Sequence, residues 1–266
     1  MKKIFGVLLS VLLTLVSITG CGSSKASDKS LTVISGKLSV GLEIGYPPME
    51  YFAEDGATPI GFDVELSQAL ADEMGLELNL VDTAWDGIFA GVDAKKYDVI
   101  ISTVSYTEDR DANYLLSKPY IANAPVLVVP NESEIASIED LEGKVIAVQM
   151  ETTADYIIQD YVAKGLGTDL RQYEKVINAF DELKAGRADA VCTDSVVAAF
   201  YLGDEATNYK IVWQAPESEP IVMCVKKDNT ALKDELEKSL DTLKENGKLS
   251  EIAVKYFGTE DVIPSN

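Results

Sequence analysis

Residues 86–110 read "DGIFAGVDAKKYDVIISTVSYTEDR", and they predict a helix, a strand and the start of a second helix. The segment 86–94 is a short helical stretch, and "YDVIIS" at 97–102 is an apolar run with the length of a buried strand. Hydroxyl side chains follow the strand. Thr107 is then a candidate N-cap, with Glu108 and Asp109 in the first turn of the next helix.

Arg110 raises the first functional question, because it falls in that same first turn. A helix N-terminus already carries positive partial charge, so an arginine there brings two positive sources together. This arrangement suggests a bound anion. A surface arginine paired with Asp111 or another carboxylate explains the same residues, and the segment alone leaves both interpretations open.

Strands and helices alternate on both sides of this segment. The alternation is typical of an α/β protein with a mostly parallel sheet. We expect further strands at 37–43, 76–82, 144–149, 188–193 and 209–214. We expect further helices at 61–75, 153–165, 178–186, 195–202, 229–247 and 249–258.

A weak internal repeat links the two halves of the chain. "FAGVDAKKYDVIIS" at 89–102 and "FDELKAGRADAVCT" at 180–193 both run from a phenylalanine through a helix to an aspartate that opens a strand. The first strand leads to Ser102 and the second to Thr193 and Asp194. Open α/β sheets bind ligands at the carboxyl ends of their strands, so each half is predicted to offer polar groups to a ligand.

Composition bounds the fold and excludes several functions. The chain has 266 residues, 47% of them hydrophobic, which suffices for one large domain or two smaller lobes. Its formal net charge of −21 argues against nucleic acid as a partner. Histidine is absent, which excludes a histidine triad, a histidine metal site and a histidine acid or base. Few ordinary catalytic options remain, and we expect no metal, no other cofactor and no catalytic residue.

The N-terminus predicts export. Lys2 and Lys3 precede 15 uncharged residues, too few for the roughly 20 that a membrane-spanning helix needs. Residues 1–20 are therefore interpreted as a signal peptide. "SITGC" resembles a bacterial lipobox, which implies lipid attachment at Cys21, although an ordinary signal peptide with an incidental cysteine fits too. The Ser-rich composition that follows predicts a flexible tether over 21–35.

Cys192 and Cys224 both lie in apolar strand-like segments. Buried free thiols are the expected state, because cysteine packs as a small hydrophobic residue. A disulfide between them remains an alternative in an exported protein.

The chain from Lys37 to Gly258 resembles the polar amino-acid-binding proteins of ABC importers, the family 3 solute-binding proteins. Six segments carry this resemblance in order and at the expected spacing. They are "VGLEIGYPPMEY" (40–51), "GFDVEL" (61–66), "WDGIFAGVDAKKYDVIIS" (85–102), "TEDR" (107–110), "VQMETT" (148–153) and "DAVCTDS" (189–195).

The resemblance implies a two-lobed, periplasmic-binding-protein-like α/β fold of type II. The lobes would comprise 36–121 with 222–258, and 126–214. A two-stranded hinge at 121–125 and 215–221 would join them, and the ligand would bind in the cleft between them.

The resemblance also implies which residues bind the ligand. Arg110 matches the arginine that holds the α-carboxylate, and Asp194 matches the acceptor of the α-ammonium. Two aromatic walls, an acidic residue, the hydroxyls after the fourth strand and a threonine pair complete the set, namely Glu43, Tyr46, Trp85, Ser102, Thr103, Ser105, Thr152 and Thr153. The sequence departs from the family pattern at Glu151, where a glycine is usual.

The function implied is capture of a free polar amino acid and its delivery to an ABC permease. The aromatic pair and Glu43 favour a basic ligand. The protein would be a monomer, lipid-anchored on the extracytoplasmic face of the cell membrane. A dehydratase-type enzyme on the same fold and a ligand-sensing subunit of a receptor remain alternatives.

Overall fold

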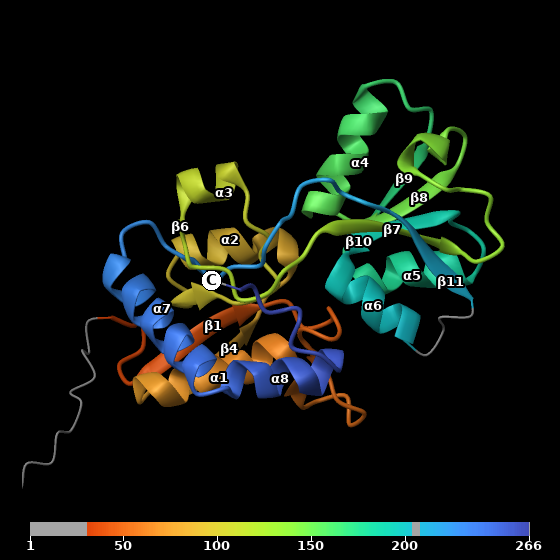
Figure 1. The fold of residues 1–266 in the computed structure, drawn as a ribbon. Helices are drawn as coiled ribbons and strands as arrows, with labels where there is room; N and C mark the ends of the chain where they lie inside the picture. Colours follow the sequence, from red (N-terminus) through yellow and green to blue (C-terminus); the bar gives the residue numbers. More distant parts are fainter. Residues whose placement is uncertain (1–30, 204–207, 266) are drawn as a thin grey trace, which may run out of the picture.

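The computed structural model describes residues 31–203 and 208–265, and these fold into two α/β bodies, each built on its own five-stranded sheet (Figure 1). The expected signal peptide and Cys21 lie outside the described residues. From Leu31 onward the chain is hydrogen-bonded to the first body: Val33 N donates to Asp98 Oδ1, and Asn229 Nδ2 donates to the Leu31 carbonyl.

The first sheet has the strand order β4-β1-β5-β12-β6. Strands β4 and β5 pair parallel to β1, whereas β12 pairs antiparallel to both β5 and β6. Strands β4, β1, β5 and β6 therefore run in one direction and β12 alone runs against them, so the sheet is mostly parallel, as expected. The antiparallel strand comes from the far end of the sequence. The strands span Lys37–Leu42 (β1), Glu77–Asp82 (β4), Val99–Ile100 (β5), Leu115–Leu116 (β6) and Cys224–Val225 (β12).

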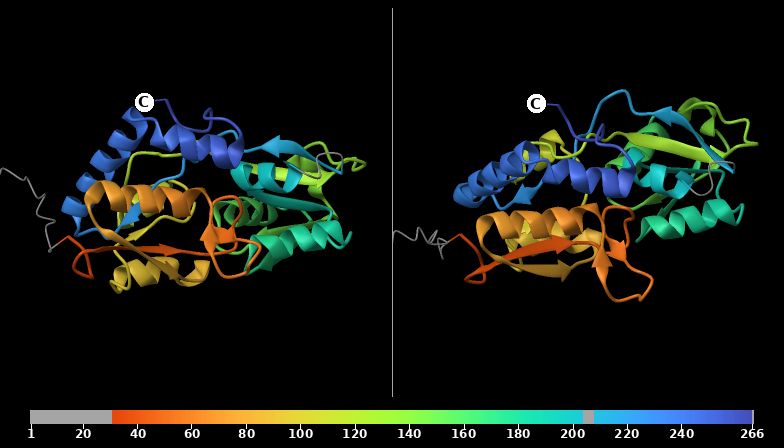
Figure 2. Two further views of the ribbon diagram at one scale, coloured as in Figure 1. Left: turned by 90° about the horizontal axis from the view of Figure 1, so that it is seen from below. Right: turned by 60° about the horizontal axis from the view of Figure 1, so that its bottom comes forward.

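Helices cover both faces of this sheet (Figures 1 and 2). Helices α1 (Phe62–Met74), α7 (Thr230–Glu245) and α8 (Lys248–Phe257) pack together over the face that includes Leu38, Val40 and Leu42. Helix α2 (Trp85–Asp93) covers the other face through Ile88 and Val92. A short hairpin of β2 (Tyr51–Phe52) and β3 (Pro59–Ile60) precedes α1, and α3 (Glu108–Asn113) follows β5.

The second sheet repeats this plan with the strand order β11-β7-β10-β8-β9. Strands β9, β8 and β10 are parallel, while β7 and β11 add two antiparallel pairings. Strand β7 alone thus runs against the other four, and this sheet too is mostly parallel, as expected. The strands span Pro125–Pro130 (β7), Val145–Gln149 (β8), Asp169–Tyr173 (β9), Ala190–Asp194 (β10) and Tyr209–Gln214 (β11).

Helix α4 (Thr153–Ala163) and the 3-10 helix η1 (Ile138–Leu141) pack on one face of the second sheet. Helices α5 (Val176–Lys184) and α6 (Ser195–Gly203) pack on the other. The helices expected from the apolar periodicity are present. Strand β9 was not expected, because "DLRQY" is a half-exposed edge strand without an apolar run.

Two extended segments connect the bodies and pair with each other. Ile221 N donates to the Ile121 carbonyl, Glu219 N to the Asn123 carbonyl, and Ala215 N to the Pro125 carbonyl. The chain end also joins them, because Ala122 N donates to the Val262 carbonyl. This pairing has the form of a two-stranded hinge.

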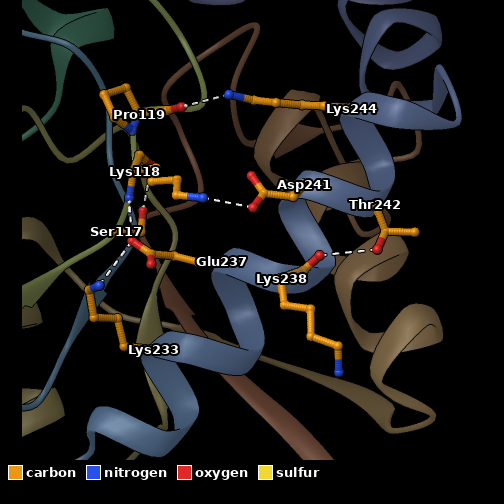
Figure 3. A network of polar contacts seen from close by, with 9 residues as sticks. All are labelled: Ser117, Lys118, Pro119, Lys233, Glu237, Lys238, Asp241, Thr242 and Lys244. Carbon is orange, nitrogen blue, oxygen red and sulfur yellow. Dashed lines mark hydrogen bonds and ion pairs between the residues drawn. The ribbon is translucent and has the colours of Figure 1, made fainter. Parts of the chain in front are cut away.

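Helix α7 contacts Lys118 and Pro119, which stand just before the first of the two segments that connect the bodies (Figure 3). Glu237 accepts a hydrogen bond from Lys118 N at 2.8 Å and pairs with Lys233 at 3.0 Å. The Lys118 ammonium pairs with Asp241 at 2.7 Å, and Lys244 donates to the Pro119 carbonyl at 3.3 Å. These contacts fix residues 118–119 to the first body just before the chain crosses.

The internal repeat has a structural counterpart. Asp98 accepts a hydrogen bond from Ser39 N, at 2.7 Å, and its own N–H donates to the Ser39 carbonyl. Asp189 makes the same pair of bonds with Val145 in the second body. Each aspartate therefore joins the start of its strand to the neighbouring strand of its sheet.

Cys192 and Cys224 are buried and free, as expected, and lie in different sheets. The alternative of a disulfide between them is wrong. Within residues 31–203 and 208–265, no helix combines the length and the apolar character that a membrane crossing requires.

Candidate functional site

A polar cavity lies where the two bodies meet, and all ten residues that the resemblance marked as ligand-binding line it. Two further polar residues, Glu50 and Gln149, complete the lining. The ten are Glu43, Tyr46, Trp85, Ser102, Thr103, Ser105, Arg110, Thr152, Thr153 and Asp194. Both sheets contribute, and their residues stand at or just beyond strand and helix ends.

Arg110 is held rigidly at the wall of this cavity. Thr107 caps α3 by accepting a hydrogen bond from Arg110 N, as the sequence predicted. The guanidinium carbon lies 5.5 Å from the centre of the Trp85 ring and 5.1 Å from that of Phe89, and Nη1 donates to the Ser105 carbonyl at 2.8 Å. Burial lowers the pKa of Arg110, but a guanidinium stays charged at any physiological pH. The interpretation of Arg110 as a surface residue paired with Asp111 is not supported.

Asp194 is the last residue of β10 and the main negative charge contributed by the second body. Its Oδ2 accepts a hydrogen bond from the Tyr46 hydroxyl at 2.5 Å, and its Oδ1 accepts one from Asn123 Nδ2 at 2.6 Å. Burial raises the pKa of this carboxyl, while the bonds from Tyr46 and Asn123 oppose the rise. A hydrogen-bonded carboxylate at this position can attract a cationic group.

Hydrogen-bond acceptors dominate another part of the lining. Gln149 Nε2 donates to Glu43 Oε2 at 2.6 Å and to the Glu174 carbonyl at 3.0 Å. Its Oε1 is buried and has no donor among the described residues. Burial raises the pKa of Glu43, and the bond from Gln149 opposes that rise. This part of the cavity is suited to a ligand group that carries N–H donors.

Two carboxylates, those of Glu50 and Asp63, accept hydrogen bonds from the loop that follows β5. Ser102 Oγ donates to Glu50 Oε1 at 2.7 Å and accepts from Glu43 N at 3.0 Å. Thr103 adopts a left-handed φ of 48°, which is unusual for a β-branched residue. Thr103 N donates to Asp63 Oδ2 at 2.7 Å, and this bond holds the backbone in its strained form.

The N-terminus of α4 closes the cavity from the second body. Thr152 is the N-cap and accepts a hydrogen bond from Asp155 N, and Thr153 begins the helix. Glu151 just before them has a left-handed φ of 61° and an exposed side chain, and its carbonyl accepts a hydrogen bond from Trp85 Nε1 at 3.0 Å. This backbone conformation is one that glycine adopts readily.

Glu151→Gly should therefore be tolerated, whereas Glu151→Val should not. A left-handed φ costs a residue with a Cβ roughly 1–2 kcal/mol, and a β-branched residue suffers most. Glycine removes this cost but loses more chain entropy on folding. The wild-type glutamate already bears this cost, so we expect the free energy of unfolding in urea to stay within about 1 kcal/mol of wild type for Gly and to fall for Val only by the extra strain of a β-branched side chain, about 1 kcal/mol.

Glu251→Gly in α8 is the matched control, because the same substitution within a helix should lower the free energy of unfolding by about 1 kcal/mol. A loss for Glu151→Gly as large as that of the control would contradict this account of Glu151.

Among the residues that the structure describes, four side-chain hydrogen bonds span the two bodies around the cavity. They join Tyr46 to Asp194, Gln149 to Glu43, Trp85 to the Glu151 carbonyl, and Lys175 to the Ile44 carbonyl. Tyr51 and Phe200 add a ring contact at 5.8 Å. Ten of the twelve lining residues are buried, and Arg110 and Thr152 are half-buried.

Sequence reasoning missed several residues of the site. Gln149 is the last residue of a strand that was expected, and a polar residue at the carboxyl end of a strand could have been predicted to face the ligand. Glu50 and Asn123 lie in irregular segments, where no periodicity marks a side chain. Phe89 belongs to an expected helix, but its contact with Arg110 depends on how α2 packs beside α3.

Comparisons with known proteins agree with this geometry. The chain is 31% identical over 227 residues to the L-cystine-binding protein TcyJ of Escherichia coli (strain K12), covering 85% of this chain and 84% of that protein. An ancestral arginine-binding protein bound to arginine has a similar structure, with a TM-score of 0.79, 34% identity, and coverage of 84% of this chain and 99% of that one.

A second solved structure is that of the ancestral amino acid-binding protein AncCDT-1, a precursor of cyclohexadienyl dehydratase. Its TM-score is 0.77 at 30% identity, covering 84% of this chain and 96% of that one. The model of the bacterial extracellular solute-binding proteins, family 3, matches residues 38–259. With two lobes around a polar cavity and a family match over most of its length, the chain belongs to the bacterial extracellular solute-binding proteins of family 3.

Proposed function

We propose that this protein captures a polar amino acid, preferably a basic one, between its two lobes and delivers it to an ABC permease. One observation carries the proposal. Arg110 from the first lobe and Asp194 from the second line the same cavity. Together they offer a fixed positive and a fixed negative charge to one small zwitterion.

The α-carboxylate would bind Arg110. A guanidinium presents parallel N–H donors that match the two oxygens of a carboxylate, and the Trp85 and Phe89 rings keep it oriented. The N-terminus of α4 at Thr152 and Thr153 would add donors to the same anion. The α-ammonium would bind Asp194, with the hydroxyls of the 102–105 loop completing the polar lining.

The ligand side chain would extend toward Glu43, Gln149 and Glu50. Gln149 Oε1 has no donor among the described residues, and the carboxyls of Glu43 and Glu50 attract positive charge, so a guanidinium or ammonium with several N–H donors suits this end of the cavity. The aromatic faces of Tyr46 and Trp85 attract a cation by roughly 0.5–2 kcal/mol each. An acidic side chain would instead meet two carboxyls at close range. Relatives named for arginine and for cystine support a polar ligand.

Calorimetric titration with arginine, lysine, histidine, glutamine, cystine and glutamate tests the ligand class. We expect at least one basic amino acid to bind more tightly than glutamine, and glutamate to bind most weakly. Glutamate binding tighter than all three basic amino acids would overturn this account of the cavity.

Ligand capture would involve a rotation of the lobes, 36–121 with 222–258 against 126–214, about the crossings at 121–125 and 215–221. A ligand held by Arg110 and by Asp194 contacts both lobes only when they are closed, so its binding energy favours that state. The four hydrogen bonds across the cleft would contribute to the same closed state.

The transport role completes the proposal. The protein would be held on the extracytoplasmic face of the cell membrane by a lipid on Cys21 and would act as a monomer. It would release the amino acid unchanged, so incubation with an amino acid or with prephenate should yield no product. Formation of a product from prephenate would instead support the dehydratase alternative.

A further inference from the structure

Glu50 and Asp63 form a buried carboxyl pair at the edge of the cavity, and the capture of an amino acid does not by itself explain it. Glu50 lines the cavity, while Asp63 in α1 lies behind it, and both residues are almost inaccessible to solvent. Burial raises the pKa of Glu50 well above its usual range, and the neighbouring Asp63 raises it further. Burial likewise raises the pKa of Asp63, to about 6.

The pair supports the loop that faces the ligand. Glu50 Oε1 accepts from Ser102 Oγ at 2.7 Å, and Asp63 Oδ2 accepts from Thr103 N at 2.7 Å. Each carboxyl thus uses one oxygen to position a residue of the 102–105 loop. The charge of the pair and the position of this loop are therefore physically linked.

The second oxygen of each carboxyl suggests that the two groups share a proton. Glu50 Oε2, Asp63 Oδ1 and the Tyr120 hydroxyl are all buried, and none of the three makes a hydrogen bond among the described residues. Two ionised carboxylates in contact repel each other, and one proton between them removes the repulsion and supplies the missing donor. Such a pair titrates as one unit.

The surroundings of the pair contain several other titratable groups. Glu43 raises the pKa of Glu50 through its negative charge, and the Tyr120 hydroxyl faces Asp63. Tyr46, Arg110 and Asp194 line the same cavity. Arg110 is engaged with the Ser105 carbonyl and with two rings, so the described residues supply no ammonium or guanidinium directly to the pair.

We propose that Glu50 and Asp63 share one proton in the free protein and that a ligand with a cationic side chain displaces this proton into solvent when it binds. The inference rests on the proposed preference for a basic amino acid. A positive charge beside Glu50 replaces the proton as the counter-charge, so both carboxyls become ionised and the proton passes to the buffer. Glu50 thereby distinguishes cationic from neutral side chains.

Calorimetry in two buffers with different ionisation enthalpies counts the protons released. At a pH near 6.5 we expect arginine to release up to about one proton per molecule bound, and its affinity to rise up to about tenfold per pH unit. Citrulline is the matched ligand, because it keeps the shape of arginine without the charge. It should release no proton from the pair.

Glu50→Gln should abolish the release caused by arginine, because the pair then lacks one of its two carboxyls. Asp63→Asn should do the same and serves as the second variant if the first fails to fold. Asp72→Asn removes a carboxyl from the exposed side of the same helix and should leave the release unchanged.

Arginine binding without proton release in the wild-type protein would overturn this proposal and leave the proposed function standing. Full release in Glu50→Gln would also overturn it, since the proton would then come from another group, such as Glu43. Failure of arginine, lysine and histidine to bind, with a neutral amino acid binding instead, would overturn both proposals.

Discussion

Arg110→Ala should weaken the binding of any α-amino acid by about 30-fold to several thousand-fold. Removing one partner of a desolvated, hydrogen-bonded charge pair costs roughly 2–5 kcal/mol, and each 1.4 kcal/mol is about a factor of ten. The loss should be similar for arginine and glutamine, because Arg110 would bind the carboxylate that all amino acids share. Calorimetry on the purified variant measures it.

Two further variants sharpen this test. Arg110→Lys keeps the charge but loses the planar fork and its stacking on Trp85 and Phe89, so it should recover only part of the affinity. Arg187→Ala removes an exposed arginine that pairs with Glu182 and should leave binding unchanged. An Arg110→Ala variant that binds as tightly as wild type would show that this residue does not hold the ligand.

Asp194→Ala should cause a loss of similar size for a different reason. The substitution removes the proposed counter-charge of the α-ammonium and leaves the Tyr46 hydroxyl and Asn123 Nδ2 without their acceptor. It also breaks one of the four hydrogen bonds across the cleft. We expect affinity for every α-amino acid to fall by about 30-fold to several thousand-fold, as measured by calorimetry.

Asp194→Asn separates the charge from the hydrogen bonds, because its amide oxygen can still accept from Asn123 Nδ2 while its NH2 group donates to the Tyr46 hydroxyl oxygen. It should remain folded while losing much of the affinity. Asp169→Ala, which removes an exposed carboxylate of β9 paired with Arg171, is the control that should bind normally. Wild-type affinity in Asp194→Asn would contradict a role for this charge in holding the α-ammonium.

The sequence predicted most of the regular elements because their apolar spacing is strong. Helix α1 is an example, because its apolar residues recur at helical spacing and Gly75 ends the helix with a φ of 69°. Short strands could not be predicted in this way. Strand β12 has two residues, and only pairing with β5 and β6, more than a hundred residues away, makes it part of the sheet.

The cavity residues were predicted from the family resemblance. Several of them were also predicted because they directly follow an expected strand or begin an expected helix. What the sequence could not reveal is contact between side chains that are distant in sequence. Glu50 acquires its significance from Asp63 and Ser102, and Gln149 from Glu43 across the cleft. Such pairings depend on how two lobes meet, which no local pattern encodes.

A crystal structure of the protein with bound arginine tests the central claim most directly. The account predicts one arginine in the cavity, with its α-carboxylate on Arg110, its α-ammonium on Asp194 and its guanidinium toward Glu43, Glu50 and Gln149. Arginine bound in the reverse orientation, with its carboxylate away from Arg110, or bound outside this cavity, would contradict it.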